Sequence, residues 1–187
     1  CDLTVKIADA VNSYPIWIYK NEMPKCPESV YETTKLDLQA KKVLDNGGVV
    51  YYSPKSEESS FNNSIRAQFS TDFWSVGTFG RQEGAMGQLI QKDHPVFKEF
   101  PTESHTNWQW WPMANQRAVV LPETVGLGKT FDAIITEMDS YAFLRPMAQL
   151  FECRVGNGKI LYSTLGLQDL QQYPEGKALL RSIYKYL

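Results

Sequence analysis

One short segment carries the order strand, helix, strand, and this order restricts the folds that the chain can adopt. Residues 30–34 (VYETT) have the pattern of a strand, residues 36–48 (LDLQAKKVLDNGG) that of a helix with an apolar stripe and a glycine stop, and residues 49–53 (VVYYS) that of a buried strand. Two strands joined through a helix pair in parallel, with a right-handed crossover. The segment therefore predicts a parallel sheet with helices on its faces.

The second half of the chain adds further strand patterns, one tight turn and a final helix. A Gly-Asn-Gly turn joins two of the strand patterns into a hairpin, because glycine and asparagine tolerate the positive φ of short hairpin turns. The predicted strands are residues 117–121, 131–139, 148–155 and 159–165, and the predicted helix is residues 174–187, with Pro174 at its start. We therefore expect an α/β fold that is flavodoxin-like or class I glutamine-amidotransferase-like, with a mostly parallel sheet, flanking helices and an antiparallel edge hairpin.

The chain of 187 residues is long enough for one ordinary domain, so residues 1–187 are predicted to form a single α/β domain. Residues 3–11 (LTVKIADAV) alternate like a half-buried strand, and residues 15–20 (PIWIYK) have the pattern of a second one. Residues 1–11 are alternatively the last strand of a preceding β-domain. Residues 54–86 show no clean period, which leaves a lid and plain packing as open interpretations.

Charge and composition weigh against several classes of protein. The net charge of −2 offers no basic surplus for nucleic acid, and no apolar run approaches the ~20 residues of a membrane span. The three cysteines, Cys1, Cys26 and Cys153, have the spacing of neither a disulfide framework nor a zinc site. Cys1 leaves two interpretations open, a lipidated terminus and the boundary of an excised fragment. The first ten residues, CDLTVKIADA, do not have the pattern of a signal peptide.

Known catalytic and cofactor motifs fit this chain poorly. Cys153 lies in a strand that enters a hairpin, without the strand-to-helix elbow of an acyl-transfer nucleophile, so we expect a core residue. His94 precedes a proline and is predicted to cap a helix rather than to bind a metal. Residues 126–130 (GLGKT) lack the spacing of a phosphate-binding loop. We expect neither a metal nor a cofactor.

Two acids at the end of a predicted strand form the weaker of two candidate sites. Glu137 and Asp139 are two residues apart, so on a strand they share a face. A pair of carboxylates is what glycoside hydrolysis requires, and with Cys153 they would form an unrecognised hydrolase or amidotransferase site. The favoured interpretation is a strand-end turn with solvated acids.

The stronger candidate site is an aromatic cluster within residues 103–111 (ESHTNWQWW). Indole faces stack on the apolar faces of sugar rings, while amide and carboxylate side chains hydrogen-bond to hydroxyl groups. Large aromatic residues also dominate cores and interfaces between domains, so an interface is the competing interpretation. We expect one tryptophan in the core and at least one at the surface, and a carbohydrate-binding module would expose two coplanar indoles. The candidate residues are Glu103, His105, Asn107, Trp108, Gln109, Trp110 and Trp111.

Several stretches together resemble the C-terminal region of bacterial glycoside hydrolase family 2 proteins, the β-galactosidase-like and β-glucuronidase-like enzymes. The resemblance covers the chain from about Asn12 onward. It rests on PIWIYK, DFWS, the Gly-x-Leu-Ile strand before KDHPVFKEFPTE, HTNWQWW, LFECRVGNGKILYSTLGL and PEGKALLRSIYKYL.

The resemblance implies a role for the chain within a larger enzyme. In that family the catalytic glutamates belong to an upstream TIM barrel, for which this chain has no segment, so no catalytic residue is carried over. The resemblance implies a non-catalytic C-terminal accessory domain with an amidotransferase-like fold and a structural or interdomain role, and alternatively a carbohydrate-binding module. Its partners would be the other domains of the parent hydrolase and carbohydrate, in the periplasm or outside the cell.

Overall fold

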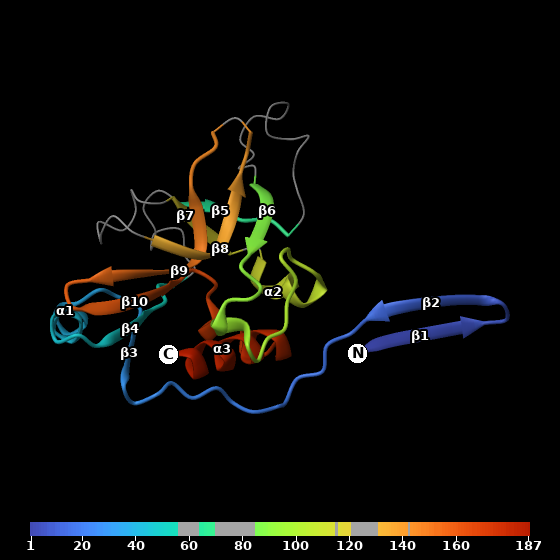
Figure 1. Cartoon of the computed structure of the whole chain (residues 1–187), viewed down its shortest axis with the longest axis horizontal. Coiled ribbons are helices and arrows are strands. Elements are labelled where there is room, and N and C mark those ends of the chain that lie inside the picture. The colour runs from blue at the N-terminus through green and yellow to red at the C-terminus, as the bar shows by residue number, and fades with distance from the viewer. Residues whose placement is uncertain (56–63, 70–84, 115, 121–130, 142) are drawn as a thin grey trace.

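The computed structural model describes all of the chain except residues 56–63, 70–84, 115, 121–130 and 142 (Figure 1). The described residues form an eight-stranded mixed sheet and a separate two-stranded sheet. The strands are β1 (Asp2–Ile7), β2 (Ala10–Pro15), β3 (Val30–Thr33), β4 (Val49–Tyr52), β5 (Ser64–Arg66), β6 (Ala85–Ile90), β7 (Arg117–Val120), β8 (Phe131–Asp139), β9 (Met147–Val155) and β10 (Gly158–Ser163). The helices are α1 (Leu38–Asp45), α2 (Trp111–Ala114) and α3 (Pro174–Tyr186), with short 3-10 helices η2 (Pro95–Phe97), η3 (Trp108–Trp110) and η4 (Leu167–Leu170).

One end of the large sheet is parallel and confirms the predicted crossover. Strand β4 pairs in parallel with β3 on one side and with β10 on the other. Helix α1 connects β3 to β4; it begins where the Asp37 side chain accepts a hydrogen bond from the backbone N–H of Ala40, 2.8 Å away. It ends at Asn46, and Gly47 then adopts a positive φ of 79°.

The other end of the sheet is antiparallel, and the predicted fold class is therefore wrong. Strand β9 pairs antiparallel with β10, β8 and β7, β8 pairs antiparallel with β6, and β7 with β5. Of the residues that the structure describes, 38% are in strands and 23% in helices, so this is a mostly β structure and not a flavodoxin-like α/β fold. The β9–β10 hairpin exists as predicted, but it lies in the middle of the strand order rather than at an edge. Antiparallel neighbours need no helical crossover, which is why helices are few here.

The N-terminal residues form a hairpin that stands apart from the large sheet (Figure 1). Strands β1 and β2 pair with each other over their whole length, and every residue of both is exposed. The prediction of a half-buried strand over residues 3–11 is wrong, because a turn at Ala8 folds that segment back on itself. The strand predicted over residues 15–20 is absent, since β2 ends at Pro15.

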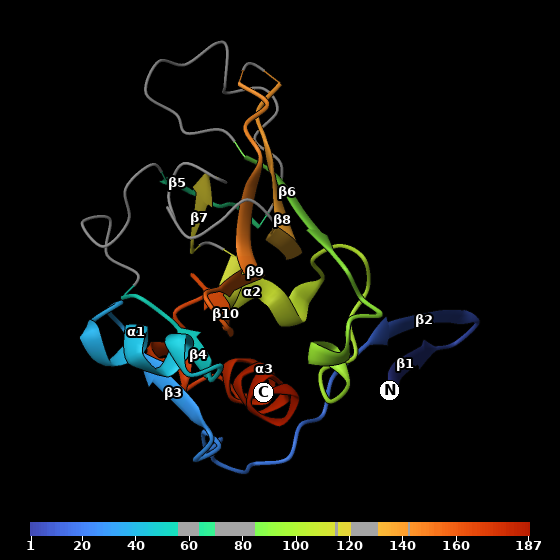
Figure 2. The same cartoon turned by 60° about the vertical axis from the view of Figure 1, so that its left-hand side comes forward.

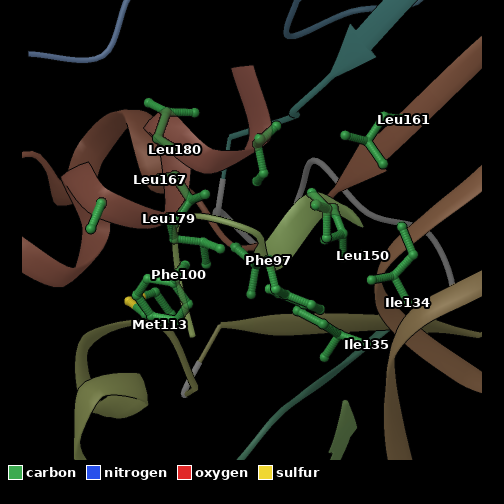
Figure 3. Close-up of a cluster of buried hydrophobic side chains, with 14 of the residues drawn as sticks. Phe97, Phe100, Met113, Ile134, Ile135, Leu150, Leu161, Leu167, Leu179 and Leu180 are labelled. Atoms are coloured by element: carbon green, nitrogen blue, oxygen red, sulfur yellow. The ribbon is translucent and has the colours of Figure 1, made fainter. Parts of the chain in front are cut away.

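The main core lies between the sheet and α3 (Figures 2 and 3). Helix α3 begins at Pro174 as predicted, and its buried Leu179 and Leu180 belong to the same hydrophobic cluster as Ile134 and Leu161 of the sheet. Phe97 and Phe100, around η2, and Met113 of α2 complete this cluster. None of the described helices is long and apolar enough to cross a membrane.

Candidate functional site

The tryptophan-rich segment over residues 101–114 is anchored to the core by one indole. Trp110 is completely buried, with its ring edge-on to Phe100 at 5.3 Å and to Phe97 at 6.1 Å between centroids. Its Nε1–H donates a hydrogen bond to Thr102 Oγ1 at 2.8 Å. A buried indole usually needs such an acceptor, and this one closes the segment on itself. Trp110 thus confirms the expectation of one tryptophan in the core.

Gln109 and Asn107 hold the backbone around that anchor. The buried amide of Gln109 donates to the carbonyl oxygen of Pro101 at 3.0 Å and accepts a hydrogen bond from the Tyr19 hydroxyl. Asn107 caps η3, because its side-chain oxygen accepts a hydrogen bond from the backbone N–H of Gln109. Gln109 therefore supports the segment, and its buried amide cannot act as the surface contact that the sequence suggested.

Two indoles point out from this anchored segment and form what we call the aromatic patch, consisting of Trp108, Trp111 and Phe69. The exposed fraction is 69% for Trp108 and 54% for Trp111. Their ring centroids lie 6.0 Å apart and their planes are inclined at 44°. Two indoles are therefore exposed, but the coplanar pair expected of a carbohydrate-binding module is absent. The half-buried Phe69 contacts both, at 5.3 Å from Trp108 and 5.2 Å from Trp111.

Three linked polar side chains come just before Trp108 in the same segment, and we call them the polar rim: Glu103, His105 and Asn107. The Nδ2 atom of Asn107 donates a hydrogen bond to Glu103 Oε2 at 3.3 Å, and His105 Nε2 lies 3.4 Å from the same oxygen. Glu103 and His105 are exposed and Asn107 is partly exposed. Five of the seven predicted residues therefore reach the surface of one segment, and the other two, Gln109 and Trp110, are buried beneath it.

Sequence reasoning missed Phe69, which completes the patch. It follows β5 in the segment 54–86, where no period singles out any aromatic residue. Its partners Trp108 and Trp111 lie about forty residues further along the chain. The contact depends on tertiary structure, and the only sequence signal for it was the richness in aromatic residues of that irregular segment.

Burial contradicts the interpretation of the second candidate site as a pair of solvated acids. Glu137 and Asp139 were interpreted as solvated acids, but both are buried at the end of β8. Asp139 accepts hydrogen bonds from the backbone N–H groups of Ser140 and Arg145 and from the Arg145 guanidinium at 2.7 and 3.1 Å. This partnership lowers the pKa of Asp139 against the opposing effect of burial. A carboxylate held this way is part of a turn rather than a free catalytic group.

The fold raises the pKa of Glu137 far above the ordinary value of a glutamate. Burial raises its pKa to about 9; the backbone amides of Gln68 and Gly87 favour the ionised form, and the charge of Asp139 disfavours it. The carboxyl group of Glu137 is therefore protonated at neutral pH. Cys153, the third member of the hypothetical hydrolase site, pairs with Phe131 at the opposite end of β8. The three side chains share no cleft, so we set that hypothesis aside.

The remaining predicted features have ordinary structural roles where the structure describes them. Cys153 is a buried core residue as predicted, and burial raises the pKa of its thiol to about 11. His94 caps η2 as predicted, with its Nδ1 accepting a hydrogen bond from the backbone N–H of Val96. Residues 126–130 lie outside the described residues. Within the described part of the chain, no three His, Cys, Asp or Glu side chains are grouped to hold a metal ion.

Comparison with known proteins identifies a family but no activity. No curated protein matches the chain. The family model described as "Domain of unknown function (DUF8487)" matches residues 31–187. This range includes the aromatic patch and all of the eight-stranded sheet except Val30, the first residue of β3, and it leaves out the β1–β2 hairpin. Because this match covers most of the chain, the protein belongs to the DUF8487 family.

Proposed function

We propose that this chain is a non-catalytic accessory domain of a multidomain glycoside hydrolase and that its aromatic patch contacts carbohydrate. The observation that carries the proposal is the pair of exposed indoles, Trp108 and Trp111, beside the polar rim. Exposed large aromatic groups gathered at one place are uncommon on a soluble surface and indicate a binding site. The resemblance to glycoside hydrolase family 2 is the reason for proposing a parent enzyme of that family. It also implies that the protein is exported to the periplasm or secreted.

The way the segment is anchored supports a binding role. Trp110 and Gln109 fix the backbone from below, so the neighbouring Trp108 and Trp111 are presented without ordering a loop at each binding event. Preorganisation of this kind raises affinity because less conformational entropy is lost on binding. The polar rim provides a carboxylate, an imidazole and an amide, which are suitable partners for sugar hydroxyl groups.

The state of the acids supports a non-catalytic role. Glycoside hydrolysis needs two carboxyl groups facing a sugar across about 5–10 Å. Asp139 is engaged by Arg145, and Glu137 is buried inside the antiparallel end of the sheet. At the aromatic patch, Glu103 is the acid of the polar rim, and its partners are Asn107 and His105.

Sugar-observed NMR saturation transfer on the purified chain tests the proposal without depending on tryptophan as the reporter. We expect neutral mono- and oligosaccharides to receive saturation, and Trp108→Ala and Trp111→Ala each to abolish most of it. Tyr14→Ala is the matched control, because Tyr14 is 52% exposed but lies on the β1–β2 hairpin. Absence of transfer to any sugar from a folded sample, or equal loss in the control, would overturn the carbohydrate role. Hydrolysis of aryl glycosides at enzymatic rates would overturn the non-catalytic role.

A second candidate function, docking onto a neighbouring domain, is favoured by the β1–β2 hairpin. Leu3, Val5 and Ile7 alternate along β1 and share one face with Tyr14 of β2, and all four are exposed. A lone two-stranded hairpin is marginally stable in water, so a covered face would stabilise it. Hydrogen exchange checks this: the hairpin amides should exchange rapidly in the isolated chain and be protected in the parent protein. Equal exchange in both would exclude hairpin-mediated docking.

A further inference from the structure

We infer that the aromatic patch takes a single neutral sugar unit, such as the end of a chain, in preference to acidic sugars and to flat polysaccharide surfaces. This inference rests on the proposed carbohydrate contact and deepens it. Two independent observations carry it: the inclination of the indoles, and the sign of the charge on the polar rim.

The inclination of the indoles limits the shape of the ligand. With planes 44° apart and centroids separated by 6.0 Å, Trp108 and Trp111 cannot both lie flat against one planar surface. Stacking on a crystalline or ribbon-like polysaccharide requires aromatic rings in a common plane. One sugar ring can instead stack on one indole while the second meets its edge. Phe69, at 31° to Trp108 and 75° to Trp111, holds this arrangement from the side.

The polar rim limits the charge of the ligand. Glu103 is its acid, and the segment of residues 100–116 contains neither lysine nor arginine. The Glu103 side chain is exposed, so its carboxylate can accept hydrogen bonds from sugar hydroxyl groups as well as the one from Asn107. Its negative charge repels a carboxylate or a sulfate on the ligand. A sugar whose C6 position is a carboxylate therefore meets like charge, whereas the corresponding alcohol does not.

The charge of one basic residue, Lys92, must be controlled for in any test of this inference. Lys92 shares a surface groove with Ser104, next to Glu103 in the sequence, and would attract an acidic sugar if its charge reached the patch. Its charge is exposed and is therefore strongly screened beyond about 10 Å at ordinary salt. Glu103, hydrogen-bonded to the residue before Trp108, has the closer connection to the indoles.

The test compares matched sugars that differ only at C6. Methyl β-galactoside is compared with methyl β-galacturonoside, and methyl β-glucoside with methyl β-glucuronoside, by NMR titration at pH 8. We expect a roughly two- to fivefold preference for the neutral sugar, the range of an interaction between exposed charges. Glu103→Gln should remove the preference, Lys92→Gln should leave it, and 1 M salt should reduce it. Powdered cellulose and chitin should retain none of the protein.

The outcomes separate this inference from the function on which it rests. Equal affinity for both members of each pair, or a preference that survives Glu103→Gln, would overturn the charge argument while leaving carbohydrate binding in place. Retention on the insoluble polysaccharides through Trp108 would overturn the shape argument. Failure of every sugar to bind would instead remove the proposed function itself.

Discussion

Each end of the eight-stranded sheet holds a glutamate, partly exposed at one end and buried at the other. At the parallel end, Glu32 of β3 accepts hydrogen bonds from the Tyr184 hydroxyl at 2.7 Å and from Gln168 Nε2 at 2.8 Å. At the antiparallel end, Glu137 of β8 is more deeply buried, and no described side chain donates a hydrogen bond to its carboxyl group. A glutamate side chain is thus a partly exposed hydrogen-bond acceptor at the parallel end, and a buried, protonated group at the antiparallel end.

The difference follows from how each end of the sheet is covered. Helix α3 and η4 pack beside the parallel strands and bring Tyr184 and Gln168 to Glu32 from more than 130 residues away in the chain. Glu137 instead lies opposite Gln88 of β6 and Met147 of β9. Gln88 itself donates to Gln149, so its amide is already engaged. A buried carboxyl group that no side chain donates to is costly, which makes the antiparallel end the place where polar substitutions should have the largest effects.

The largest effect is expected from Asp139→Ala. The Asp139 side chain is 1% exposed and joins Arg145 and the two backbone N–H groups that close the β8–β9 turn. Breaking a buried ion pair costs about 3–5 kcal/mol, and since Arg145 is partly exposed we expect about 3 kcal/mol. Urea unfolding at pH 7 measures it. Asp132→Ala, an exposed acid on the same strand, is the control and should change the unfolding free energy by less than about 0.5 kcal/mol. A similar, small loss in both variants would contradict the role of Asp139.

The next effect is a pH dependence that Glu137→Gln should remove. Because the folded-state pKa of about 9 exceeds the unfolded value of 4.5, the folded state holds the proton more tightly, and stability falls as pH rises between these values. The loss between pH 5 and pH 8 should be about 2–4 kcal/mol. Burial lowers the pKa of His94, which gives the opposite slope near pH 6, so the informative quantity is the difference between the two proteins. Parallel stability curves for both would show that Glu137 ionises freely.

At the parallel end, backbone packing rather than charge is the sensitive feature, and Gly158→Ala tests it. A Cβ atom at Gly158 would lie 2.6 Å from the carbonyl oxygen of Gly48 and 2.8 Å from the Cα of Leu44, where α1, β4 and β10 converge. Backbone atoms cannot rotate away, so we expect a loss of about 1–3 kcal/mol by urea unfolding. Asn157→Ala, in the adjacent exposed turn, should cost less than about 1 kcal/mol. A neutral Gly158→Ala would mean that α1 shifts to accommodate the methyl group.

The two ends also differ in how far the sequence could predict them. The parallel end was predictable because its strand, helix and glycine stop are contiguous, from Val30 to Tyr52, and the crossover rule fixes their pairing. The direction of β7 and β8 depends on pairings between strands that are distant in the chain, and no local pattern in the sequence fixes these pairings. The same limit applies to the site. Three tryptophans in four residues predicted that one would be buried and at least one exposed, but not that Trp110 is the buried one. Phe69 and the burial of Glu137 depend on contacts distant in the chain.

The smallest effect is expected from Tyr184→Phe, which removes one donor from Glu32. The ring would remain edge-on to Tyr51, 5.9 Å between centroids, so only the hydroxyl group is lost. Burial and the nearby Glu32 raise the pKa of Tyr184, so the hydroxyl stays a donor over the accessible pH range. A hydrogen bond to a charged acceptor contributes about 1.5–3 kcal/mol, but Glu32 keeps its bond from Gln168, so we expect a loss of about 1 kcal/mol.

Urea unfolding of Tyr184→Phe beside Tyr52→Phe decides whether the Glu32 network stabilises the parallel end. Tyr52 packs edge-on against Tyr162 at 4.7 Å, and within the described residues its hydroxyl makes no hydrogen bond, so its loss should leave stability within about 0.5 kcal/mol. Equal values for the two variants would mean that water replaces the Tyr184 hydroxyl at Glu32. Water rather than the Tyr184 hydroxyl would then stabilise the Glu32 carboxylate. The two ends of the sheet would differ only in burial, because the partly exposed Glu32 keeps an access to water that Glu137 lacks.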